Sequence, residues 1–137
     1  MRLIACLLVL LLCGCSATQF KQEFIGYFAS DVKASENKHV LNFDMSASDC
    51  ITKIKDLLKN MQAIIRENRR MQYIAADNFQ NVFDSTIDTT QVGILVISTP
   101  ADKCEVQIAS GNLGLAAFVS DEISKNLNPR PKEDAVK

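Results

Sequence analysis

The chain has no tryptophan, a single histidine, three prolines and no excess of positive charge. Its 15 basic side chains stand against 16 acidic ones, which gives a formal net charge of −1. A protein that binds nucleic acid through bulk charge needs a basic face, so this balance argues against that class. The 137 residues are enough for one domain with a buried core.

The longest apolar run of the chain lies at the amino terminus. Leu3 to Leu12 is unbroken and follows the positive charge of Arg2. A transmembrane helix needs about 20 apolar residues, so this run is too short to be a permanent span. A short apolar run between a positive residue and small residues is typical of an export signal. We therefore expect residues 1–14 to be a signal peptide.

The segment Leu12-Cys13-Gly14-Cys15 resembles the lipobox of bacterial lipoproteins, which has a leucine three residues before a cysteine and a small residue immediately before it. The resemblance implies that diacylglycerol is attached to the Cys15 thiol. Cleavage after Gly14 and acylation of the new amino terminus, with chains such as palmitate, would follow. Cys13 departs from the family pattern, in which a small residue such as Ala or Ser is usual. The alternative is an ordinary signal peptide cleaved after Ala17.

Lipidation would determine where the protein resides. Each buried CH₂ group contributes about 0.8 kcal/mol to membrane binding, so three acyl chains on one residue would hold it essentially permanently. Ser16, rather than an aspartate, follows Cys15. In the sorting pattern of Gram-negative lipoproteins, this resemblance favours the outer membrane. We expect the domain to face the periplasm.

The rest of the chain carries the patterns of a mixed α and β domain. Ser46 and Asp49 have the spacing of a capping box before an amphipathic segment. A second helical stripe ends at Leu127. We expect helices over residues 47–60 and 113–127, and strands over residues 39–45, 62–66, 71–79, 91–97 and 103–109.

This order, β-α-β-β-β-β-α, predicts an α+β fold with an antiparallel sheet of about five strands under two helices on one face. It resembles, at the level of fold alone, the arrangement in domains similar to the TATA-binding protein. We expect the domain to span residues 37–127. A lipidated tether and lead-in (15–36) comes before it, with an aromatic strand or irregular segment at 20–28, and a disordered charged tail (128–137) follows it. We also expect a loop over residues 30–38, across the start of the domain, and a polar loop over residues 84–90 within it.

Taken in order, these features resemble a family of short bacterial lipoproteins classed as a domain of unknown function. The resemblance covers nearly the whole precursor, from the lipobox to the closing helix that ends at Leu127. Family members usually have a shorter link between the lipobox and the first helix. The resemblance implies no reaction, no cofactor and no catalytic residue.

Catalytic and metal sites find little support in the sequence. His39 has no G-x-S-x-G motif to accompany it, and a zinc site with Cys50 and Cys104 would lack the usual ligand spacing. Ser110 to Gly114 is interpreted as a helix start rather than a phosphate-binding loop. The aspartates lack the regularity of a calcium loop and are interpreted as solvated charges; they are Asp84, Asp88, Asp102 and Asp121.

The expected function is that of a non-enzymatic envelope lipoprotein that binds a protein or ligand. A small cell-envelope enzyme and a lipoprotein exposed to a host are the alternatives. Arg66, Arg69 and Arg70 form a basic cluster near an expected hairpin turn. We interpret it as a solvated turn, with contact to anionic lipid or glycan as the alternative.

The cysteine count predicts one disulfide. Cys6 and Cys13 would leave with the signal peptide and Cys15 would be alkylated, so Cys50 and Cys104 would remain in an oxidising compartment. Both belong to apolar faces, and they come close if the first and last strands are antiparallel neighbours. Closing a loop of about 54 residues would contribute ~4 kcal/mol in the chain-entropy model. Two buried free thiols are the alternative.

Overall fold

The computed structural model describes residues 28–79 and 91–128. The predictions for the signal peptide, the lipobox, the tether up to Tyr27 and the polar loop at 84–90 lie outside the described residues. So does the prediction for the tail, apart from Asn128.

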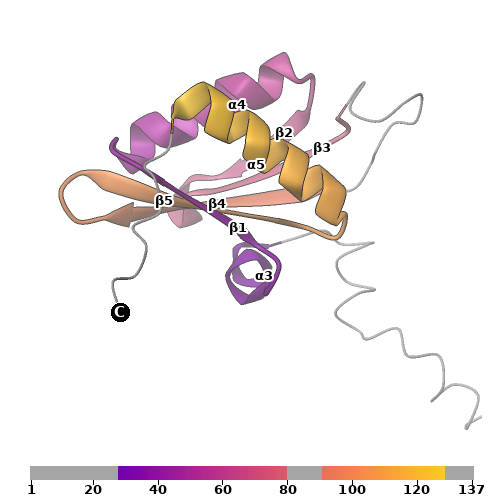
Figure 1. Cartoon of the computed structure of the whole chain (residues 1–137), viewed down its shortest axis with the longest axis horizontal. Coiled ribbons are helices and arrows are strands. Elements are labelled where there is room, and N and C mark those ends of the chain that lie inside the picture. Colours follow the sequence, from indigo (N-terminus) through magenta and orange to yellow (C-terminus); the bar gives the residue numbers. More distant parts are fainter. Residues whose placement is uncertain (1–27, 80–90, 129–137) are drawn as a thin grey trace, which may run out of the picture.

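The described helices and strands follow the predicted order, and one further helix, α3, comes before the first strand in the chain (Figure 1). In chain order they are α3 (Ala29–Ala34), β1 (His39–Phe43), α4 (Ala47–Asn60), β2 (Ile64–Asn68), the 3₁₀ turn η1 (Arg69–Met71), β3 (Tyr73–Asp77), β4 (Val92–Thr99), β5 (Lys103–Ser110) and α5 (Leu113–Leu127).

The strands form one five-stranded antiparallel sheet in the order β1-β5-β4-β3-β2. The predicted α+β class is therefore confirmed. β1 and β5 are antiparallel neighbours, with Phe43 opposite Cys104, as the disulfide prediction required. β4 and β5 lie in the middle of the sheet, which explains why Val92 to Val96 is buried throughout.

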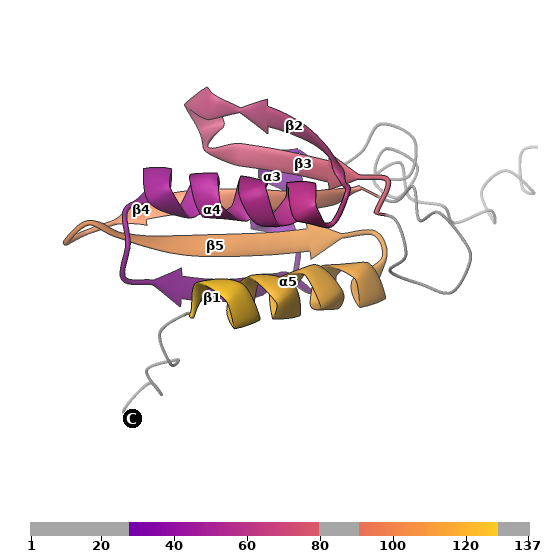
Figure 2. The same ribbon diagram turned by 90° about the horizontal axis from the view of Figure 1, so that it is seen from above.

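Helices α4 and α5 lie side by side on one face of the sheet (Figure 2). Both begin where a polar side chain caps the first turn. The Ser46 hydroxyl accepts a hydrogen bond from the backbone N–H of Asp49 at 3.1 Å, and Asn112 Oδ1 accepts one from Leu115 at 3.1 Å. These caps fix both helix starts at the predicted positions, so the bounds 47–60 and 113–127 are confirmed.

The main core fills the space between these two helices and the sheet. Its largest fully buried side chains include Phe43 from β1, Ile54 from α4 and Ile123 from α5. Cys104, Val106 and Ile108 of β5 point into the same core, and Glu105 and Gln107 between them do not. This alternation is the pattern that predicted the strand.

The prediction of a loop over residues 30–38 is wrong for its first half, where α3 forms. This helix lies on the opposite face of the sheet from α4 and α5 (Figure 1). Ala29 and Val32 are buried there against Leu95 and Ala109. The domain therefore includes a helix that precedes the predicted boundary at residue 37. Six residues with two inward-facing apolar side chains are too few to show a helical period.

Candidate functional site

The predicted site residues fall in two regions. Cys15 lies outside the described residues, whereas Cys50 and Cys104 are both in the main core with no exposed surface. Cys50 belongs to the first turn of α4, where its backbone N–H bonds to the Ser46 carbonyl at 3.0 Å. Cys104 is the second residue of β5, opposite Phe43 at the end of β1.

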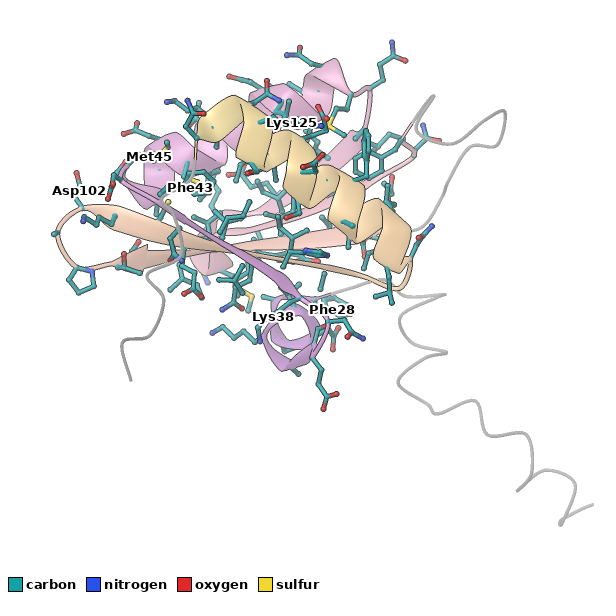
Figure 3. The ribbon with its side chains drawn as sticks, in the orientation of Figure 1. Phe28, Lys38, Phe43, Met45, Asp102 and Lys125 are labelled. Carbon is teal, nitrogen blue, oxygen red and sulfur yellow. The ribbon has the colours of Figure 1, made fainter. Side chains whose placement is uncertain are left out.

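The short connection from β1 to α4 brings the two cysteines together. Figure 3 labels Phe43 and Met45 at the end of β1, near the β4–β5 hairpin that carries Asp102. The chain then turns directly into α4, so Cys50 packs over the start of β5. The side chains of Cys50 and Cys104 are hydrogen bonded to each other.

Both cysteines are free thiols in this structure, so the predicted disulfide is not formed in it. The geometric part of that prediction is confirmed, since the two side chains share one core and β1 and β5 are antiparallel neighbours. The disulfide itself stays a prediction.

The thiol pair does not have the properties of an activated nucleophile. A cysteine at a helix N-terminus often has a lowered pKa. At Cys50, burial instead raises the pKa, and the hydrogen bond with Cys104 raises it further. A nucleophilic cysteine needs both thiolate character and access, and Cys50 has neither.

A shallow polar pocket of about 360 Å³ lies on the surface where α4 meets β2 and η1. It is lined by Ser48, Ile51, Thr52, Lys55, Glu67, Arg69 and Gln72. Among these lining residues, the Lys55 ammonium lies 2.7 Å from the Glu67 carboxylate, and Arg69 Nε lies 3.7 Å from the same oxygen. No pattern in the sequence predicts this pocket, because its residues meet only through packing of separate elements.

Two cations in this pocket, Lys55 and Arg69, lie beside its single carboxylate, that of Glu67. The hydrogen bond from Lys55 lowers the pKa of Glu67, and the charges of Lys55 and Arg69 act in the same direction. A general acid or base works best with a pKa near the operating pH. A lowered pKa moves Glu67 away from that range, so the pocket is better suited to polar contact than to proton transfer.

The predicted basic cluster is divided by the fold. Arg66 lies on β2 and forms an ion pair with Asp77 of β3, whereas Arg69 lies in η1 beside Glu67. Two of the three arginines are thus engaged by carboxylates of the domain. This division weakens the alternative of a joint contact with anionic lipid or glycan.

The structure also places the other residues that were considered for catalysis, phosphate binding or metal binding. His39 begins β1 opposite Ile108. Ser110 donates to the Gln91 carbonyl at 2.9 Å and accepts from Asn112 at 3.2 Å, which supports the interpretation of a helix start. Within residues 28–79 and 91–128, no group of three or more His, Cys, Asp or Glu side chains is placed to hold a metal ion.

Two further findings concern membrane spans and known proteins. Among the described residues, no helix combines the length and apolar character needed to cross a membrane. Comparison of the chain with models of known protein families and with curated proteins gives no match. The resemblance to a lipoprotein family therefore stays a prediction from the residues themselves.

Proposed function

We propose that the protein is a bacterial envelope lipoprotein, anchored by acyl chains on Cys15. The observation that carries this proposal is the resemblance of Leu12-Cys13-Gly14-Cys15 to a lipobox, directly after an apolar run of export-signal length. Removal of residues 1–14 would leave Cys15 as the first residue of the mature chain. Ser16 favours retention at the outer membrane, with the domain in the periplasm.

The domain would act by binding a protein or ligand of the envelope rather than by catalysis. Two properties of the described residues support a binding role. The polar pocket is lined by hydroxyl, amide and paired charged groups, which suit polar contact. The buried thiols are inaccessible, which argues against their use as nucleophiles.

The anchor is tested by changing two neighbouring cysteines separately. Cells expressing the unaltered chain, Cys15→Ala or Cys13→Ala are fed a fatty acid that carries a clickable alkyne. We expect the label on the unaltered chain and on Cys13→Ala, because alanine is common at that lipobox position. Cys15→Ala should lose the label and accumulate as an uncleaved or soluble form. Equal labelling of Cys15→Ala would overturn the proposal.

The orientation is tested by protease treatment of intact cells. A domain in the periplasm is protected until the outer membrane is permeabilised. Digestion in intact cells would instead favour the alternative of a host-exposed lipoprotein. Chemical cross-linking in cells, with acyl chains intact, would then reveal whether the domain has a stable envelope partner.

A further inference from the structure

The contact between Cys50 and Cys104 is fully buried in the described domain. Both side chains have no exposed surface, and each thiol is within hydrogen-bonding distance of the other. The segments that carry them are also tied together at the rim, because Asp44 Oδ1 lies 3.1 Å from Lys103 Nζ. The pair is therefore preorganised for a bond and shielded from any reagent in solution.

This combination sets a condition on when the bond can form. Thiol–disulfide exchange starts from an accessible thiolate. In the folded domain, both thiols are inaccessible to a reagent in solution. Burial also raises the pKa of Cys50, which disfavours its thiolate. In an unfolded chain neither restriction applies.

We propose that the Cys50–Cys104 disulfide forms while the exported chain is still unfolded, and that closure of the core then seals it. The bond would join the first turn of α4 to the start of β5. This proposal rests on the proposed envelope location, where the chain meets oxidants before it folds. A chain that folds under reducing conditions would keep the two free thiols.

The chemistry is a two-electron oxidation. Two S–H bonds break, one S–S bond forms, and the pair releases two electrons and two protons. The oxidant is a disulfide, either that of a thiol–disulfide oxidoreductase or of a small compound such as oxidised glutathione. It accepts the two electrons and two protons and becomes two thiols, through a mixed-disulfide intermediate.

The first arm of the test determines the redox state in cells. The mature protein is extracted from the envelope, denatured without reductant in the presence of a maleimide and weighed by mass spectrometry. We expect no maleimide on Cys50 or Cys104 before reduction and one on each after it. Labelling of both before reduction would overturn the proposal. The mass on Cys15 is read from the same spectrum, so a missing lipid would count against the anchor alone.

The second arm tests the sealing of the core. The same protein is reduced in denaturant, refolded with reductant and transferred to oxidised glutathione. We expect free thiols to disappear at least about a hundredfold more slowly in native buffer than in denaturant, because reaction requires the core to open. Urea below the unfolding transition should shorten this delay. Comparable rates in the two buffers would contradict the proposed order of oxidation and folding.

A matched variant tests whether the disulfide stabilises the folded domain. Reduction should lower the melting temperature of the unaltered protein by about 15 °C or more, as expected for a loop of this length. The double variant Cys50→Ala/Cys104→Ala should show no dependence on reductant. If the unaltered protein also melts at the same temperature with and without reductant, the bond does not constrain the chain and the proposal fails.

Discussion

Glu67 illustrates how single residues of this domain depend on partners from other elements. Its carboxylate on β2 accepts a hydrogen bond from Lys55 of α4, twelve residues earlier, and faces Arg69 of η1. The Lys55 and Glu67 side chains are one-quarter and one-fifth exposed, so water screens the pair only in part. This ion pair connects the helix to an edge strand of the sheet.

Replacing Glu67 by Gln should destabilise the fold slightly, by up to about 1 kcal/mol at pH 7. The pKa of Glu67 is lowered in the folded state, so its contribution is present above its ordinary value of 4.5. The contribution is lost as the pH falls through the lower folded value. Urea unfolding of both proteins at pH 7 and in acid should therefore show a difference that disappears in acid.

Asp56→Asn provides the matched control for this measurement. Asp56 also pairs with a lysine, Lys59 at 3.4 Å, but both side chains are about two-thirds exposed. We expect almost no change in stability from this substitution at either pH. A pH-independent loss in Glu67→Gln would show that the carboxylate acts through shape rather than charge.

At the scale of elements, the two long helices follow from local signals and α3 does not. α4 and α5 have polar caps, and each has an apolar stripe that runs its whole length, so the sequence was sufficient to predict their bounds. Alternation predicts β1 and β5, and a continuous apolar run predicts β4, although β1 ends at Phe43 instead of Met45. β2 extends to Asn68, two residues beyond its predicted end, so the turn lies at η1. α3 is held by its contacts with the far face of the sheet, which a short segment cannot reveal.

The candidate site was less predictable than the fold. The closeness of Cys50 and Cys104 could be inferred because both side chains belong to apolar faces and their strands are neighbours. The polar pocket and the division of the arginine cluster depend on which charged side chains meet across elements. Charged surface residues have no periodic constraint that would show this in a sequence.

A charged side chain introduced on the buried face of α5 should strongly destabilise the domain. Val119 has no exposed surface, so Val119→Asp would bury an unpaired carboxylate and destabilise the domain by about 4 kcal/mol or more. Ala117→Asp places the same side chain on the exposed face of the same helix and should cost less than about 1 kcal/mol. Denaturation followed by circular dichroism compares them. Equal losses would mean that helix propensity, not burial, determines the effect.

The contribution of α3 can be measured through its central anchor. Val32 is fully buried against the second face of the sheet, so Val32→Ala should destabilise by roughly 2 kcal/mol. Lys33→Ala changes the exposed neighbour and should be nearly neutral. Chemical denaturation of the two variants measures this difference. A neutral Val32→Ala would show that α3 adds nothing to the stability of the sheet.

At the scale of the whole molecule, the proposed anchor and the described domain have complementary roles. Acyl chains on Cys15 would supply the membrane attachment, and the three-layered domain would supply the surface that meets a partner. The described domain has paired charges in its polar pocket and apolar side chains buried on both faces of the sheet. Its oxidation state would depend on whether it folds before or after export.

The central claim, that Cys15 is the lipidated first residue of the mature chain, is tested most directly at that residue. The protein is extracted from membranes, digested, and its amino-terminal peptide is identified by tandem mass spectrometry. The account predicts a peptide that begins at Cys15 with diacylglycerol on sulfur and an acyl group on nitrogen. An unmodified peptide that begins at Thr18, the product of ordinary signal cleavage after Ala17, would contradict it.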